Sequence, residues 1–144
     1  MSKKWNEWAP VPIRLVFGGF LAYHGYPKVF TAAGHASFLH IMQQTGIPFP
    51  QVMAWVIGLL EFFGGLTIVL GAFVVTAATL IVIELSINII MALINGGFPT
   101  PLNPNQPLPG YASSFLYICG FLALVIGGAG GFSLTRMVVP KPSD

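Results

Sequence analysis

Six polar side chains interrupt long apolar stretches of this sequence, where few other polar groups are at hand to partner them. They are Arg14, His24, Lys28, Glu61, Glu84 and Asn88. Carboxylates, an imidazole and an amine can hydrogen-bond the polar end of a lipid-soluble molecule or pass protons among themselves. These six residues are therefore the candidates for ligand binding or proton relay, and the sequence assigns none of them a catalytic role.

The composition indicates that these residues lie in a membrane. Of the 144 residues, 55% are hydrophobic and 7% are charged, whereas soluble domains carry about 25% charged residues. So few charges could not cover the surface of a soluble globule of this size, which excludes a soluble enzyme. The net charge of +2 is small and scattered along the chain, so nucleic acid is not expected as a partner.

Four apolar stretches are long enough to cross a bilayer as helices, which takes about 20 residues. They run from Val11 to Phe30, Val52 to Leu70, Ala72 to Ile94 and Ala112 to Gly130. Helices satisfy their own backbone hydrogen bonds in lipid. The sequence therefore predicts an all-α, polytopic membrane protein: a four-transmembrane-helix bundle formed by a single domain over residues 1–144.

Loops are expected between these stretches. The segment after Phe30 contains Gly34, Gly46, Pro48 and Pro50 and is predicted to be an outer loop, with Pro50 suited to the first turn of the second helix. The second and third helices are expected to join tightly near Gly71. The segment 95–110 carries five prolines, which cannot propagate a helix, and it is predicted to be irregular.

The basic residues predict the orientation. Lys3, Lys4, Arg136 and Lys141 lie just outside the first and last stretches, whereas the two long connecting segments contain no Lys or Arg. By the positive-inside rule both termini are cytoplasmic. A signal peptide is the alternative interpretation of the first stretch, but its charged residues interrupt the apolar run and no A-x-A cleavage site follows.

The spacing of the polar residues predicts a buried cluster. His24 and Lys28 are four residues apart, as are Glu84 and Asn88, so each pair shares one helix face. Counting about 1.5 Å per residue along each helix puts these four and Glu61 in the outer half of the membrane. We expect Glu61 and Glu84 to face His24, Lys28 and Asn88.

Arg14 follows the face of Lys28 toward the cytoplasm and is expected to extend partly to the inner interface. The alternative for all these charges is structural, because ion pairs could simply fix the register of the helices.

Other chemistry is not indicated by the sequence. The three histidines lack a carboxylate at ligand spacing, so no metal site is expected. The single cysteine, Cys119, leaves no intrachain disulfide and no redox pair. We therefore expect no intrinsic cofactor. Separately, glycines around Glu61 let another helix or a flat ligand approach closely.

Three sequence elements, taken in order, resemble the DoxX family of small bacterial membrane proteins. The first is RLVFG at Arg14–Gly18 followed by HGYPK at His24–Lys28; the second is GIP at Gly46–Pro48 leading into EFFGGL at Glu61–Leu66 and Gly71; the third is the tail GGAGGFSL at Gly127–Leu134. The tail departs from the family pattern at two positions, because Gly131 stands where Arg is usual and Thr135 where Asp is usual.

The resemblance implies a protein of the bacterial cytoplasmic membrane that is associated with an oxidoreductase system. Some relatives are linked to quinone-coupled oxidation of sulfur compounds and others to redox-stress complexes, but the resemblance transfers no reaction. The first hypothesis is a redox-system subunit that binds a quinone or similar amphipathic molecule at the cluster of Glu61, Glu84, His24 and Lys28. Its possible partners are the bilayer, a redox-enzyme subunit and a second copy of itself. The alternatives are a structural or assembly module and a small proton-coupled transporter.

Overall fold

The computed structural model describes residues 7–44, 46–96 and 110–135, and in these residues every regular element is helical. The elements are α2 (Pro10–Ile13), η1 (Arg14–Gly18, a π-helical turn), α3 (Gly19–Phe30), α4 (Ala32–Gln44), α5 (Pro50–Leu70), α6 (Val74–Gly96) and α7 (Gly110–Gly127). The predicted all-α class is thus confirmed for the described part of the chain.

The first predicted span forms one helical run from Pro10 to Phe30, made of α2, η1 and α3. Pro10 stands in its first turn, where the missing N–H is not needed. Pro27 lies inside α3 and removes one backbone donor. The run ends at Thr31, whose backbone is extended at φ −124°, and the chain turns sharply there.

The segment predicted to be the first outer loop contains helix α4, so this expectation was wrong for Ala32–Gln44. The Thr31 hydroxyl accepts the Gly34 N–H at 3.1 Å, which is the bond of a helix N-cap. Gly34 lies within this helix and does not break it. A Cβ at this position would collide with the Pro27 carbonyl, so glycine alone permits this close approach. Gly46, at φ +68°, comes after the end of the helix.

Helices α5 and α6 meet at a tight turn, as predicted. Gly71 ends α5 in the left-handed conformation, with φ +76°, which costs glycine little. By length and composition, two helices could cross a membrane: Pro50–Leu70 and the part of α6 over Val74–Met91; the apolar helix over Ser113–Gly127 is shorter. The count of four spans therefore stays a prediction. The proline-rich segment lies mostly outside the described residues.

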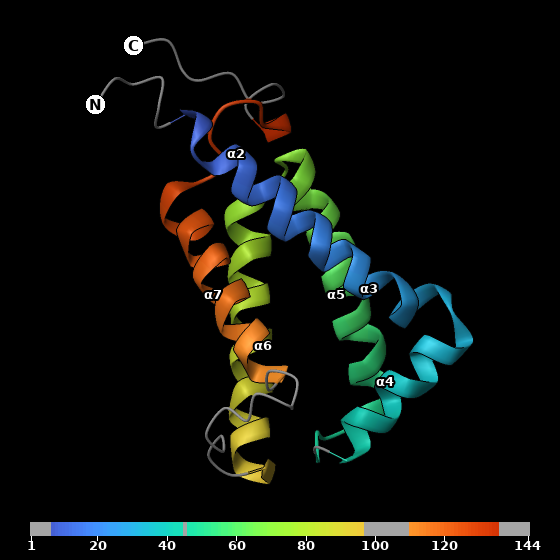
Figure 1. Cartoon of the computed structure of the whole chain (residues 1–144). Helices are drawn as coiled ribbons and strands as arrows, with labels where there is room; N and C mark the ends of the chain where they lie inside the picture. The colour runs from blue at the N-terminus through green and yellow to red at the C-terminus, as the bar shows by residue number, and fades with distance from the viewer. Residues whose placement is uncertain (1–6, 45, 97–109, 136–144) are drawn as a thin grey trace, which may run out of the picture.

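The helices pack as two pairs that are joined at one end (Figure 1). Helix α3 packs along α5, and α6 packs along α7. At the joined end, the Gly131 N–H donates to the Glu7 carbonyl at 2.6 Å and the rings of Trp8 and Phe132 lie 5.0 Å apart. The first and last described residues therefore meet. Helix α4 lies near the opposite end, against α3 and α5.

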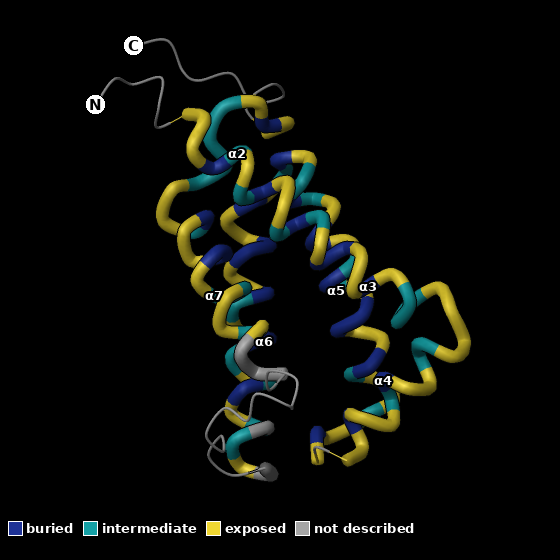
Figure 2. The backbone as a smooth tube through the Cα atoms, in the orientation of Figure 1, coloured by how far each residue is buried: buried dark blue, intermediate teal, exposed yellow. Residues whose placement is uncertain are grey.

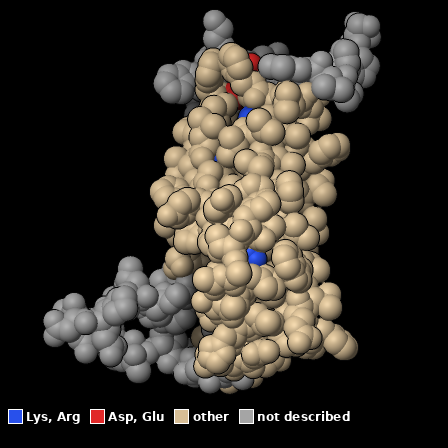
Figure 3. All heavy atoms as spheres, turned by 90° about the vertical axis from the view of Figure 1, so that its right-hand side faces the viewer, with Lys and Arg blue, Asp and Glu red and all other residues tan. Residues whose placement is uncertain are grey.

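Buried residues lie mainly where the helices face one another, and large apolar side chains cover the outside (Figure 2). One core lies between α6, α7 and parts of α3 and α5, and includes Ile68, Ile81 and Phe121; a second, between α4 and α5, includes Met42 and Ala54. On the face shown in Figure 3, charged atoms are visible only as isolated spots. Such a surface suits contact with lipid.

Candidate functional site

An ion pair joins α3 to α5. The Lys28 ammonium lies 2.7 Å from Oε1 and 2.6 Å from Oε2 of Glu61, and the two side chains are 19% and 7% exposed. The helices can approach closely because glycines face backbone: a Cβ at Gly65 would lie 2.6 Å from the Ala22 nitrogen, and one at Gly25 would collide with Phe62. The sequence-predicted pairing of Lys28 with Glu61 is present.

Helix α4 covers this ion pair with aromatic groups that the sequence analysis did not single out. The Lys28 ammonium lies 4.0 Å from the centre of the Phe38 ring, a favourable position for a cation over an aromatic face. Nδ1 of His35 hydrogen-bonds the Lys28 carbonyl at 2.9 Å, and its ring lies 4.2 Å from that of Trp55. Phe38 follows Lys28 by only ten residues in the sequence, but no sequence pattern shows that the chain folds back between them. The contact could therefore not be predicted.

A second pair lies on α6. The Asn88 amide donates to Oε1 of Glu84, as their four-residue spacing predicts. The other carboxyl oxygen, Oε2, is buried and has no hydrogen-bond partner among the described residues. Glu84 is close enough to interact with the charges of Glu61 and Lys28. These four residues, Lys28, Glu61, Glu84 and Asn88, are called the polar cluster below.

His24 does not join the polar cluster by any hydrogen bond within the described residues. Its side chain is exposed, and its ring contacts are with Tyr23 and Tyr117, at 6.1 and 6.3 Å between centroids. Tyr117 on α7 is in turn close enough to Glu61 to interact with its charge. Tyr117 therefore lies near both the His24 ring and Glu61, a proximity that no spacing within the first helix could reveal.

Arg14 is enclosed by the chain at the joined end of the bundle, where it is 3% exposed. Its expected extension to the inner membrane interface stays a prediction. Its guanidinium donates to five backbone carbonyls, at the end of α5 and in the segment after α7: Ile68 (3.0 Å), Val69 (3.0 Å), Ala129 (2.7 Å), Gly131 (3.3 Å) and Phe132 (3.2 Å). The last carbonyls of a helix have no partners within it, and Arg14 supplies donors to them.

The tail after α7 docks on the α5–α6 turn without the charges usual in its motif. The Thr135 hydroxyl accepts the Phe73 N–H at 3.3 Å and donates to the Gly71 carbonyl at 3.2 Å. Gly131 contributes only backbone, through its carbonyl to Arg14 and its N–H to Glu7. A hydroxyl thus binds here where the motif usually has an acid.

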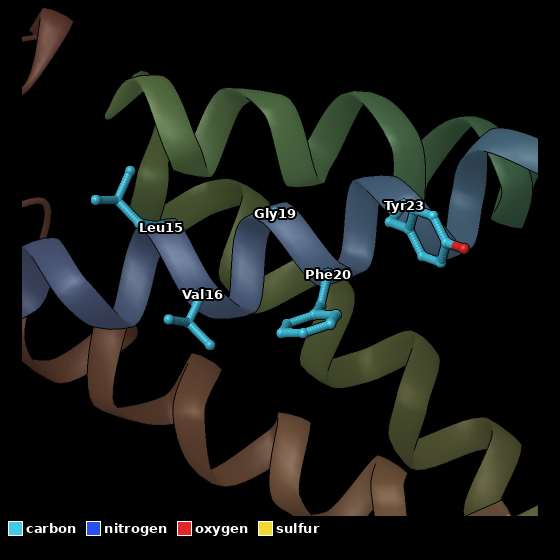
Figure 4. A pocket seen from close by; sticks show the side chains of 5 residues that line it. All are labelled: Leu15, Val16, Gly19, Phe20 and Tyr23. Carbon is cyan, nitrogen blue, oxygen red and sulfur yellow. The ribbon is translucent and has the colours of Figure 1, made fainter.

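Two hollows lie next to these helices. One, of about 180 Å³, lies between α5 and α6; it is lined by Ile47, Met53, Val56, Ile57, Leu60, Leu80, Ile83, Glu84, Ile87 and Asn88. The other, of about 340 Å³, is open and lies on the outer face of the first helix (Figure 4), over Gly19 and between Leu15, Val16, Phe20 and Tyr23. The second hollow contains no charged group, whereas the first reaches the polar cluster.

The described residues contain no group of three His, Cys, Asp or Glu side chains that could hold a metal ion. Cys119 lies exposed on α7 as a free thiol. In and beside the polar cluster, the described residues provide one ion pair, one carboxyl–amide pair and an aromatic contact between the exposed His24 ring and Tyr117.

Apolar helices that bury charges define a helical membrane protein. A model of the DoxX family matches residues 9–94, from the first helix through the third predicted span. The chain therefore belongs to the DoxX family. The match does not include α7 or the tail, so the likeness of the tail to its motif stays a resemblance. No curated protein and no solved structure matches the chain.

Proposed function

We propose that this DoxX protein is a membrane subunit of an oxidoreductase system and binds a quinone or a similar amphipathic molecule at the polar cluster. The observation that carries the proposal is a hollow of about 180 Å³ that is apolar along its length and polar where Glu84 and Asn88 line it. An amphipathic ring molecule needs this combination, with apolar contact for the ring and hydrogen-bonding groups for its oxygens. The family resemblance supplies the redox association.

The ion pair has a defined part in this proposal. Lys28 and Glu61 are close enough to Glu84 to interact with its charge. A proton or charge gained by a molecule bound at Glu84 would therefore interact electrostatically with both Lys28 and Glu61. The location proposed for the protein is the bacterial cytoplasmic membrane, where such molecules are dissolved, with four spans and both termini cytoplasmic. Within the family, the redox reaction itself would belong to a partner protein.

The test is to extract the protein from bacterial membranes in polymer-bounded nanodiscs and to measure quinones and co-purifying proteins by mass spectrometry. The wild type is expected to hold more quinone per phospholipid than the bulk membrane, and Glu61→Gln several-fold less. Thr79→Val is the matched control, because the Thr79 hydroxyl is exposed and bonds only its own helix at Val75. Equal quinone in wild type and bulk membrane, or undiminished quinone in a folded Glu61→Gln protein, would overturn the proposal.

A second candidate, a structural or assembly module, is favoured by one observation. Lys28 is fully engaged by Glu61 and Phe38, and Arg14 by five carbonyls, so both cations have partners inside the chain. A scaffold predicts that loss of the ion pair lowers stability and partner recovery together, with no ligand lost. Partner recovery in the same purification separates the two candidates.

A further inference from the structure

The hollow between α5 and α6 is lined in part by Glu84, and one oxygen of its carboxyl group has no hydrogen-bond partner in the described chain. Glu84 is 7% exposed, and its Oε1 accepts the Asn88 amide while Oε2 is buried without a partner. A buried polar atom without a hydrogen bond is unfavourable, and more so in lipid, where water is absent. The remaining lining consists of eight apolar side chains.

The mouth of this hollow faces the bilayer. Val56, Leu80, Ile83 and Ile87, which line it, are each about half exposed, at 49%, 48%, 52% and 50%. Glu84 is ten residues from the start of α6, which is about 15 Å along the helix and near the middle of a hydrocarbon core of about 30 Å. A molecule that enters must therefore arrive dissolved in the membrane.

The size of the hollow limits the occupant. Its volume is about 180 Å³, and a protein cavity of about 150 Å³ holds a benzene ring. One six-membered ring with a short substituent fits, and any long tail would lie outside among the lipids. A hydroxyl group on such a ring both donates and accepts a hydrogen bond, so it complements the Glu84 carboxyl group whether that group is charged or neutral.

We propose that this hollow is a binding site for lipid-soluble single-ring molecules that carry a hydroxyl group, with the hydroxyl bonded to the carboxyl group of Glu84. This inference rests on the proposed function only in assuming a membrane-dissolved ligand; it names the ligand class and the entry route, between α5 and α6. In a molecule that exists as a ring diketone and a ring diol, the site would favour the diol.

The test uses 4-ethylphenol and its methyl ether, 4-ethylanisole, which differ in the donor hydroxyl and a methyl group. Four isoleucines, Ile47, Ile57, Ile83 and Ile87, line the hollow, so ¹³C-methyl NMR of isoleucine-labelled protein in nanodiscs locates binding. Ile68, fully buried in the other core, and Ile126, exposed on α7, are internal controls. The phenol is expected to shift the four lining methyls and to bind about tenfold more tightly than the ether.

Glu84→Leu is expected to abolish this tenfold preference, and Glu84→Gln, which keeps both a donor and an acceptor, to retain part of it. If Glu84→Leu does not fold, Ile83→Trp fills the mouth from the membrane side and is expected to prevent binding of both compounds. Equal affinities for phenol and ether in the wild type, a preference that survives in Glu84→Leu, or shifts at Ile126 alone would overturn the inference.

These results are independent of the quinone measurement above. A wild type that holds quinone but shows no preference for the phenol would leave the proposed function standing and remove this ligand class. A phenol preference without retained quinone would leave the site standing and remove the redox association.

Discussion

Each buried charge in this chain has a different kind of partner. Lys28 binds a carboxylate and lies over an aromatic ring, and Arg14 donates to backbone carbonyls. Glu84 accepts a hydrogen bond from one amide, and its other carboxyl oxygen has no partner among the described residues. Charges at membrane depth are costly and mark functional sites more often than structural ones. By this criterion the burial of Arg14 is explained by a structural role, because each of its hydrogen bonds described above goes to a backbone carbonyl. The burial of Glu84 is not explained in this way.

The first prediction concerns the cost of breaking the ion pair. Lys28→Met leaves the Glu61 carboxyl buried without its cation, so we expect a loss of about 3–5 kcal/mol in the free energy of unfolding. The double variant Lys28→Met, Glu61→Leu should recover most of this loss, because it removes both charges. Equilibrium unfolding in mixed micelles measures both values, with Thr79→Val as the control.

If the double variant is no more stable than Lys28→Met, the ion pair is not the reason for the loss. The cation–π contact would then be the next explanation, because both variants also remove the ammonium over Phe38. Phe38→Leu alone tests it and should cost about 0.5–2 kcal/mol.

At the scale of single residues, sequence spacing predicted those partners that lie on one helix or carry opposite charge. Glu84 with Asn88 and Lys28 with Glu61 are of this kind. The partners of Arg14 could not be predicted, because backbone carbonyls have no residue identity. Tyr117 and Phe38 were missed for another reason: which ring meets His24 or Lys28 depends on how the helices pack.

At the scale of elements, glycines determine how closely α3 approaches α5. A Cβ at Gly65 would lie 2.6 Å from both the Gly18 carbonyl oxygen and the Ala22 nitrogen, which are backbone atoms of the first helix. A backbone cannot yield as a side chain can, and this approach is what places Lys28 within reach of Glu61. The polar cluster thus depends on the small residues that flank it.

Gly65→Ala is therefore expected to destabilise the protein by about 1–3 kcal/mol or more through overpacking. Gly19→Ala, on the same helix pair, is the matched control, because a Cβ at Gly19 meets nothing within 4 Å. It should be neutral or slightly stabilising, since alanine favours a helix. Equal unfolding midpoints for the two variants in the same micelles would contradict the close approach.

The element that sequence reasoning missed is α4. Gly34 and the glycine and prolines further on were interpreted as loop signals, but the run from Ala32 to Gln44 is helical, and the positive φ values of this segment, at Gly46 and Phe49, come after it. The signal present in the sequence was Thr31, whose hydroxyl accepts the Gly34 N–H as the N-cap of this helix. Its consequence for the site is large, because α4 brings Phe38 over Lys28.

At the scale of the whole molecule, the contact between the first and last described segments bears on which side of the membrane each end of the bundle lies. Glu7 and Trp8 contact Gly131 and Phe132, and Arg14 bonds the same segment, so the chain leaves and re-enters one end of the bundle. Helix α4 lies near the other end. An even number of crossings follows if the bundle spans the membrane, and the excess of Lys and Arg beside the ends predicts that this side is cytoplasmic.

Single cysteines test this arrangement, in a background where Cys119 is replaced by serine. We expect Gln43→Cys, exposed at the end of α4, to react with a membrane-impermeant maleimide in bacteria stripped of their outer membrane. Ser2→Cys and Ser143→Cys should react only after the cytoplasmic membrane is opened, because both ends are predicted to be cytoplasmic. Reaction of Ser2→Cys and Ser143→Cys from opposite sides would require an odd number of crossings. Reaction of both from outside, with Gln43→Cys protected until the membrane is opened, would reverse the charge-based orientation.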